Sequence, residues 1–213
     1  MTEVERVHVA DVYEGIADHF SSTRYKAWPF VDSWLKDLPA GSIGLDIGGG
    51  NGKYLSSNGQ VYILCSDQSY SLTKHAMEAS RWKCADAMVA DVMALPHPPG
   101  KFDFSLSIAV LHHLSTRDRR LAATKRILDL LRVGGRCLLY VWALEQESRR
   151  HWNNGIDQDV FVPWHAQLPK KTYQRFYHLY KCGELEQDVI EAGGTVISSG
   201  FERDNWWCVA CRL

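Results

Sequence analysis

The stretch LDIGGGNGKYL, residues 45–55, decides the fold of this chain. It puts Asp46 at the end of an apolar run that predicts a strand, followed by glycines at positions 48, 50 and 52. Glycine is required where a side chain would keep the backbone away from a ligand, and where a tight strand-to-helix turn needs a positive φ. The stretch therefore predicts a nucleotide-binding turn after the first strand of an α/β domain.

The residues missing from this turn narrow the choice of ligand. A dinucleotide-binding turn needs a third glycine where this chain has Lys53, and a phosphate-binding loop needs Gly in place of Ile47 and Ser or Thr in place of Tyr54. The remaining pattern, Asp-x-Gly-x-Gly-x-Gly, resembles the first motif of the Rossmann-like S-adenosylmethionine-dependent methyltransferases. Their cofactor has no phosphates and needs no anion cradle. The resemblance implies that S-adenosylmethionine binds at this turn.

Acidic residues follow the next two strand-like runs. Asp67 ends VYILCSD, about 20 residues beyond the turn, where an acid usually accepts the two ribose hydroxyls; it could also be a helix N-cap. Asp91 follows a third apolar run, and in the class that the turn resembles an acid here binds the adenine amino group. The fourth run, FDFSLSIAVLHHL, places Ser107 and His112 where that class borders the reacting methyl group. The predicted cofactor-binding set is Tyr13, His19, Asp46, Gly48, Gly50, Asp67, Gln68, Asp91, Val92 and Ser107.

Composition limits the domain count and the compartment. With 213 residues and 46% hydrophobic content, the chain can bury one good α/β core, which favours a single domain over residues 1–213. No apolar run approaches the ~20 residues of a membrane span, so no membrane association is expected. The N-terminus lacks the basic start and apolar middle of a signal peptide, which predicts a cytosolic or nuclear protein.

Helical and strand-like patterns alternate along the chain. The spacing of apolar residues predicts a helix over 9–20 and a second helix after Pro29. Strands are predicted near 43–47, 61–66, 87–90, 104–108, 137–142, 194–199 and 206–212, with helical stretches between them. Such alternation is typical of βαβ units. With the resemblance above, it predicts an α/β protein with the Rossmann-like class I methyltransferase fold, a seven-stranded mostly parallel sheet flanked by helices.

Two segments carry finer predictions. A helix over 116–131 is predicted to begin with a capping box of Ser115 and Asp118 and to stop at Gly134-Gly135. The stretch WNNGIDQDVFVPWHAQLPKKT, residues 152–172, is predicted to be irregular.

Cysteine spacing predicts free thiols. The six cysteines, at 65, 84, 137, 182, 208 and 211, lie mostly in apolar runs, as buried free thiols do. The pair in CVAC has no second pair spaced for zinc, and in a strand its sulfur-bearing residues would lie ~10 Å apart. No metal site is predicted.

Six strings resemble one family over nearly the whole chain. SSTRYKAWP, SIAVLHHLSTRDRR, YVWALEQ, DQDVFVPW, FYHLYKCGELE and GFERDNWW are similar to the eukaryotic tRNA methyltransferases that esterify 5-carboxymethyluridine at the wobble position of the anticodon. That family carries a long basic insertion between the equivalents of FVPW and FYHLY, whereas here only HAQLPKKTYQR separates Trp164 from Phe176. The chain is either a short homologue or one from which the insertion was removed. The resemblance implies N-terminal lid helices over 1–38 and a substrate-side insertion over about 145–178.

The chemistry of such a reaction predicts which side chains bind the substrate. A carboxylate nucleophile is already ionised at neutral pH, because reference carboxyl pKa values lie near ~4, so no general base is required. An arginine fork or a histidine can orient the anion. The predicted catalytic residues are therefore Arg24, His112, Arg203 and Asn205, with His113 a further candidate. Tyr13, His19 and Phe20 could be core residues, but their place in the family favours a lid over the cofactor.

Charge argues against strong unaided tRNA binding. The net charge is −1, whereas phosphate contacts dominate the affinity of nucleic-acid binders. Local basic clusters occur along the 116–131 helix, predicted to be a solvated face, and between Arg149 and Arg175. The second cluster is interleaved with Trp152, Trp164 and Tyr173, which suits an unstacked anticodon loop.

The sequence thus predicts a tRNA methyltransferase that uses S-adenosylmethionine to esterify the carboxylate of 5-carboxymethyluridine at the wobble position. A small-molecule carboxyl methyltransferase and a non-catalytic cofactor-binding scaffold are the alternatives. The family resemblance implies two partners, the tRNA anticodon loop and a small zinc-binding activator protein in a heterodimer. The third strand, near Ala87–Ala90, is predicted to lie at a sheet edge and to pair with that activator.

Overall fold

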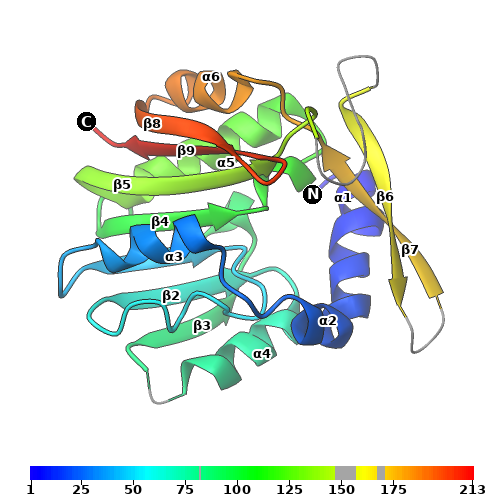
Figure 1. The fold of residues 1–213 in the computed structure, drawn as a ribbon, viewed down its shortest axis with the longest axis horizontal. Coiled ribbons are helices and arrows are strands. Elements are labelled where there is room, and N and C mark those ends of the chain that lie inside the picture. Colours follow the sequence, from blue (N-terminus) through cyan, green and yellow to red (C-terminus); the bar gives the residue numbers. More distant parts are fainter. Residues whose placement is uncertain (82, 147–156, 167–170) are drawn as a thin grey trace.

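The computed structural model describes residues 1–81, 83–146, 157–166 and 171–213, and it confirms the predicted seven-stranded sheet. The strands stand in the order β3-β2-β1-β4-β5-β9-β8 (Figure 1). Their bounds are β1 Ile43–Ile47, β2 Tyr62–Asp67, β3 Ala85–Val89, β4 Phe102–Ile108, β5 Leu131–Trp142, β8 Thr195–Glu202 and β9 Asn205–Cys211.

The direction of the strands places the acidic residues at one edge. The strands from β3 to β5 are parallel to their neighbours, and only β9 runs antiparallel, between β5 and β8. The carboxyl ends of parallel strands meet at the same edge of a sheet, which is where open α/β sheets bind ligands. Asp46 at the end of β1 and Asp67 at the end of β2 therefore come together.

Helices cover both faces of the sheet. One face packs buried Leu45, Leu139 and Cys208 against α5 and α6, and the other packs Ile63, Phe104 and Tyr140 with α3 and α4. The helices are α1 Glu3–Glu5, α2 Asp11–Thr23, α3 Pro29–Lys36, α4 Tyr70–Ser80, α5 Arg117–Leu130 and α6 Glu184–Glu191. A π-helical segment, η1 Arg6–Ala10, joins α1 to α2, and two 3₁₀ turns are η2 Val92–Ala94 and η3 Leu111–His113.

Two local predictions are wrong. Residues 48–61 between β1 and β2 form turns rather than a helix, because Gly48, Gly50 and Gly52 all have positive φ and the segment makes hydrogen bonds of the i to i+3 kind. The N-cap of α5 is Thr116, which accepts from the backbone N–H of Arg119. Ser115 instead bonds to Glu5 and Thr2 and so ties the N-terminus to the segment before α5.

A hairpin lies where the sequence predicted an irregular stretch. Strands β6 Asp159–Ala166 and β7 Lys171–His178 pair antiparallel in a separate two-stranded sheet. Alternate residues of β6, among them Val162, Trp164 and Ala166, are buried, which is the period of a strand with one covered face. The hairpin and α2 lie side by side beyond the ends of the parallel strands (Figure 1).

The cysteines agree with the sequence prediction in being free, but only in part in being buried. All six cysteines are free, as predicted, but Cys84 and Cys182 are exposed and Cys211 is half-buried, so burial holds only for the other three. In the part of the chain that the structure describes, no helix is long and apolar enough to cross a membrane.

Candidate active site

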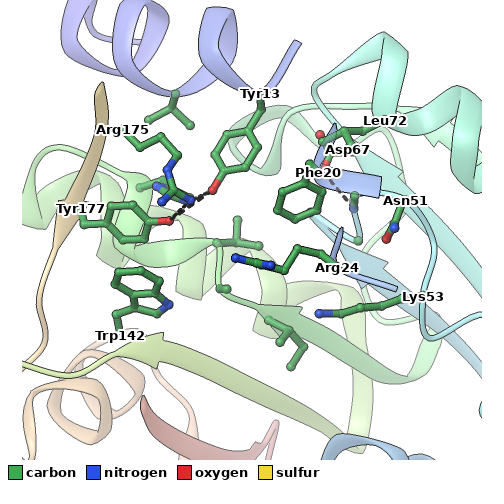
Figure 2. Close-up of a pocket in the computed structure, with 18 of the residues that line it drawn as sticks. Tyr13, Phe20, Arg24, Asn51, Lys53, Asp67, Leu72, Trp142, Arg175 and Tyr177 are labelled. Carbon is green, nitrogen blue, oxygen red and sulfur yellow. Dashed lines mark hydrogen bonds between the residues drawn. The ribbon is translucent and has the colours of Figure 1, made fainter. Parts of the chain in front are cut away.

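A cavity of about 1350 Å³ opens at the carboxyl ends of the parallel strands, beneath α2 and the β6–β7 hairpin. Figure 2 shows that its lining separates into two halves. The glycine-turn half contains the turn after β1 together with Asp67, Leu72 and Phe20. The aromatic half is lined by Tyr13, Trp142, Trp164, Arg175 and Tyr177, and Arg24 points into the space between the halves.

Two glycines of the turn are required by its geometry. Gly48 has φ 69°, and a Cβ there would lie 2.3 Å from Val110. Gly50 has φ 58°, but a Cβ there would meet only Phe20, at 3.6 Å, so this glycine leaves open space on the side of the lid helix. The turn therefore offers bare backbone to a bound molecule, as its sequence predicts.

Asp67 is held by the turn and keeps spare capacity as an acceptor. Its Oδ2 accepts from the backbone N–H of Gly50 at 3.0 Å, and its Oδ1 accepts from Ser69 at 2.9 Å. Burial raises the pKa of Asp67 to about 6. Each carboxylate oxygen has about two lone-pair sites, so the group can still accept two hydroxyl hydrogen bonds. The N-cap of α4 is Ser69, so the alternative role for Asp67 does not apply.

Asp46 and Lys53 form an electrostatic pair at the floor of the cavity. Asp46 is buried, and neither of its carboxylate oxygens has a hydrogen-bond partner among the described residues. Burial raises the pKa of Asp46 to about 7, and burial lowers that of Lys53 to about 8. The Lys53 ammonium lies 5.0 Å from the ring centre of Trp28 and 4.9 Å from that of Tyr54. The floor is therefore close to neutral at physiological pH.

The aromatic half is a group of packed rings around the guanidinium of Arg175. Tyr177 stacks on Trp142 with ring centres 4.2 Å apart and 23° between the planes. The guanidinium of Arg175 lies 4.8 Å from the ring centre of Trp164 and donates to the Tyr177 hydroxyl at 2.8 Å. The guanidinium of Arg24, which is exposed, lies 5.2 Å from the same Trp164 ring.

The two adjacent histidines have different places. His113 lines the cavity: its Nδ1 bonds the carbonyl of Phe176 at 2.8 Å, and its Nε2 bonds the hydroxyl of Tyr13 at 2.9 Å. His112 is fully buried, accepts at Nδ1 from the backbone N–H of Trp142, and does not line the cavity. Burial lowers the pKa of both, that of His113 to about 3, so both rings are neutral. The position of His112 gives no support to a catalytic role.

All but two of the predicted site residues line this one cavity. Ser107 lies buried inside β4 and His112 lies behind His113. Asp91 lines the cavity and also caps η2 by accepting from Met93 at 2.9 Å. The predicted residues in the lining are Tyr13, His19, Arg24, Asp46, Gly48, Gly50, Asp67, Gln68, Asp91, Val92, Arg203 and Asn205. Their chemical roles stay predictions.

Arg203 and Asn205 belong to the β8–β9 turn. Arg203 and Asp204 have φ 51° and 63°, the conformation of a two-residue type I′ hairpin. The Asn205 amide donates to the carbonyls of Glu202 at 3.3 Å and Arg203 at 2.6 Å. Asn205 therefore holds the turn, and Arg203 projects from it as an exposed cation at the cavity.

Trp142, Tyr177 and Lys53 line the cavity but were not among the predicted residues. Trp142 and Tyr177 stand inside YVWALEQ and FYHLY, strings that carried the family resemblance. A strand period over 171–178 would also have placed Arg175 and Tyr177 on one face. Lys53 gave no comparable signal, because only the fold brings it over the rings of Trp28 and Tyr54.

The basic clusters differ from the prediction. Arg120 of α5 is buried, while Arg117 pairs with Glu191 at 2.7 Å and Arg119 with Glu5 at 2.7 Å, so this helix is not a simple solvated face. Of the second cluster, Arg149-Arg150, Trp152 and Lys170 lie outside the described residues.

Fold and site together define a class. The strand order with a single antiparallel strand, the open glycine turn after β1 and an acid with spare acceptor capacity after β2 are those of a Rossmann-like S-adenosylmethionine-dependent methyltransferase. Residues 45–139 match the family model described as a methyltransferase domain.

A solved complex of DhpI with SAH superposes with TM-score 0.73 at 15% identity, covering 98% of this chain and 97% of that one. A Haloferax volcanii complex of the Trm112 methyltransferase activator and a methyltransferase has a chain with TM-score 0.70 at 14% identity, covering 95% and 96%.

Relatives narrow the class to a family. The tRNA (carboxymethyluridine(34)-5-O)-methyltransferase of Schizosaccharomyces pombe is 44% identical over 98% of this chain and 97% of its own. That of Saccharomyces cerevisiae is 40% identical over 98% and 96%. This chain belongs to the tRNA (carboxymethyluridine(34)-5-O)-methyltransferase family. The S. cerevisiae alignment spans 271 positions although this chain has 213 residues, so that relative carries inserted residues that this chain lacks.

Proposed function

We propose that this protein transfers a methyl group from S-adenosylmethionine to the carboxylate of 5-carboxymethyluridine at the wobble position of a tRNA anticodon. Membership of the family supports the reaction. The observation that carries the proposal is the single cavity whose glycine-turn half continues into an aromatic half with a buried guanidinium. One half has the groups for a nucleoside cofactor, and the other has the rings and the cation for a second, anionic nucleoside.

The chemistry of the proposed reaction matches the neutral state of the nearby histidines. When bound, the cofactor supplies an electrophilic methyl: a carboxylate oxygen bonds to the methyl carbon, the carbon–sulfur bond breaks and its electron pair stays on sulfur. No proton moves, so no base is needed. His113, neutral because burial lowers its pKa to about 3, can therefore serve as a fixed hydrogen-bond acceptor for Tyr13. The task of the protein is to orient the acceptor and exclude water.

Residues of the glycine-turn half would hold the cofactor. Asp67 would accept the ribose hydroxyls, and the open backbone at Gly50 lets the nucleoside approach. Phe20 of α2 covers this half from the lid side. Trp142 and Trp164 would border the acceptor base, since aromatic rings stack on unpaired bases.

A comparison of acceptors tests the proposal. The protein, with its activator, is incubated with labelled S-adenosylmethionine and with anticodon stem-loops that carry or lack the 5-carboxymethyl group. Transfer confined to the carboxymethyl stem-loop, giving a base-labile ester, is expected. Equal transfer to the free carboxymethyl nucleoside would favour a small-molecule methyltransferase. Cofactor binding by calorimetry without transfer to either acceptor would favour a scaffold.

We also propose that a small zinc-binding activator pairs with β3, the strand at one edge of the sheet. Val89 at the carboxyl end of β3 is 49% exposed, and Tyr62, at the opposite end of the β2–β3 ladder, is 40% exposed, so apolar surface lies at both ends of this edge. Such an edge is a ready site for strand addition. The Haloferax volcanii complex contains a methyltransferase of the same fold with its activator.

A further inference from the structure

Among the residues that the structure describes, Arg175 is a buried cation without an acidic partner. Its side chain is 6% exposed, and its Nε has no hydrogen-bond partner among the described residues. Burial acts to lower the pKa of Arg175, but the hydroxyls of Tyr177 and Tyr13 outweigh it, so the group remains charged. No ion pair within the described residues includes Arg175. An unpaired buried charge is costly, which indicates that a ligand supplies the missing anion.

Two other buried charges among the described residues are neutralised by the chain itself. Arg120, 4% exposed and lying over the ring of Tyr180, reaches Glu184 at 4.0 Å. The buried carboxylate of Glu5 accepts from Arg119 at 2.7 Å. Arg175 also lies over a tyrosine ring, that of Tyr177 at 5.2 Å, yet it faces the cavity instead of a carboxylate.

A directed chain of hydrogen bonds fixes the guanidinium. His113 Nδ1 faces the carbonyl of Phe176, so it must carry the proton, and Nε2 must accept from the hydroxyl of Tyr13. The Tyr13 oxygen is thereby left to accept, and it does so from Arg175. Tyr177 accepts from Arg175 Nη1 at 2.8 Å and is itself held by its stacking on Trp142. Figure 2 shows these side chains converging on the aromatic half.

We infer that Arg175 is the residue that binds the carboxylate of the methyl acceptor, and that Tyr13, Tyr177 and His113 are positioning residues that aim its guanidinium. The inference rests on the proposed function and deepens it, because it assigns the substrate anion to one side chain. Arg24 lies between the two halves and would border the acceptor. Because it is exposed, water screens its charge, and it does not need a ligand anion as Arg175 does.

The guanidinium suits this task better than another cation would. Its planar fork can bind both oxygens of a carboxylate and fix the plane of the group. Each oxygen keeps a further lone pair for the bond to the methyl carbon, so the anion is oriented without being protonated. The rings of Trp164 and Tyr177 hold the fork in place and keep water from it.

The test pairs a change in the protein with a change in the substrate. Binding of two anticodon stem-loops is measured in the presence of S-adenosylhomocysteine, one carrying 5-carboxymethyluridine and the other its neutral amide, 5-carbamoylmethyluridine. The wild-type protein should prefer the carboxylate by roughly tenfold to a hundredfold, the range for a hydrogen bond to a charged group. Arg175→Gln should remove this preference, lower methyl transfer by a similar factor and leave affinity for S-adenosylhomocysteine unchanged.

Two variants keep the test decisive. Arg175→Lys retains the charge but not the planar fork, so it should keep only part of the preference for the carboxylate over the amide. If Arg175→Gln does not fold, this partial loss in Arg175→Lys tests the assignment instead. Arg120→Gln is the matched control, since it removes an equally buried arginine over a tyrosine ring outside the cavity. It should lower stability and keep the full preference for the carboxylate.

Three results would overturn the assignment. One is a preference for the carboxylate in Arg175→Gln equal to that of the wild type. Another is a wild-type protein that methylates the carboxymethyl stem-loop but binds the amide equally well. The third is a folded Arg175→Gln that loses S-adenosylhomocysteine binding, because Arg175 would then bind the carboxylate of the cofactor. Failure of the proposed function itself differs from all three, since the wild type would then transfer no methyl group to the stem-loop, or would transfer it equally to the free carboxymethyl nucleoside.

Discussion

At the scale of single residues, the carboxylate of Asp67 bonds the glycine turn and is the group proposed to bind the cofactor ribose. Both of its oxygens are already bonded to backbone N–H groups, and burial raises its pKa to about 6. Only the ionised form has full acceptor capacity, so the proposed role of Asp67 would make cofactor affinity depend on a group that titrates just below neutral pH.

Asp67→Asn should therefore weaken S-adenosylmethionine binding by ~1.5–3 kcal/mol, the range for a hydrogen bond to a charged group. Wild-type affinity should fall as pH drops below about 6, the pKa of Asp67, and the variant should show less of this fall. Calorimetric titration across this range measures both effects, with circular dichroism to check the fold. Equal affinity of the two proteins at neutral pH would remove Asp67 from the cofactor site.

Asp46 contributes to the pH dependence of stability in the cofactor-free protein. Burial raises the pKa of Asp46 from its ordinary value of 3.8 to about 7, so the folded protein binds an extra proton between these two pH values. When folding raises the pKa of a carboxyl group, the stability that this group contributes is greatest below its pKa in the unfolded protein. That stability is lost as the pH rises towards the pKa in the folded protein.

Asp46→Asn should remove the loss of stability that ionisation of Asp46 causes as the pH rises. Relative to the wild type, the variant should gain unfolding free energy on the order of 1–3 kcal/mol as pH rises from about 4 to about 7, with no further gain above that. Urea unfolding at several pH values gives the difference. A constant difference across the range would mean that Asp46 ionises normally.

At the scale of elements, β3 has one bonded and one free side. Ile63 N–H donates to the carbonyl of Cys84, and Ala90 N–H donates to that of Asp67. Since backbone groups alternate along a strand, Met88 bonds inward to β2, whereas Ala87 and Val89 face the open edge. The carboxylate of Asp86 accepts from the outward N–H of Ala87 at 2.8 Å, which blunts part of this edge.

Val89→Pro should therefore abolish assembly with the activator and leave the sheet and cofactor binding intact, because it removes an outward donor only. Met88→Pro should instead break the β2–β3 ladder and destabilise the fold. Ile197→Pro is the control: Ile197 is also 49% exposed and lies at a register shift on β8, the opposite edge. Light scattering of the mixtures measures a one-to-one complex. Assembly by Val89→Pro, or its loss in Ile197→Pro, would place the partner elsewhere.

At the scale of the whole molecule, Trp164 joins the hairpin to the lid helix. Its indole N–H donates to His19 Nδ1 at 3.1 Å, its ring meets that of Phe20 at 6.0 Å, and it clusters with buried Val12 and Ile16 of α2. The lid and the hairpin are thus one packed unit over the cavity.

Trp164→Ala should loosen this unit by ~3–5 kcal/mol, the usual cost of removing a large buried ring. Amide hydrogen exchange should speed up in α2 and in β6–β7, whereas β1, β2 and β4 should exchange as before. The affinity of Trp164→Ala for S-adenosylhomocysteine should also be lower than that of the wild type, because the loosened lid covers the cavity. Uniformly faster exchange in every strand would mean that the lid is not a separate unit of stability.

Much of the fold and part of the site could be read from local sequence. Strand runs, the glycine turn and the acids at strand ends depend on neighbouring residues and on the rule that parallel strands end at one edge, so Asp46, Asp67 and Asp91 were found together. The β6–β7 hairpin was missed because its burial comes from packing on α2, which is far away in the sequence.

The α/β class, the strand ends and the family follow from the sequence alone, because they depend on short-range periodicity and on motif strings. That His113 rather than His112 faces the cavity emerges only from the packed fold, since a short turn at 111–113 orients the two rings differently. The same holds for Arg175, which is buried with no acidic partner among the described residues. Which charges are neutralised depends on contacts between residues far apart in the chain, and those contacts exist only once the lid, the hairpin and the sheet have packed together.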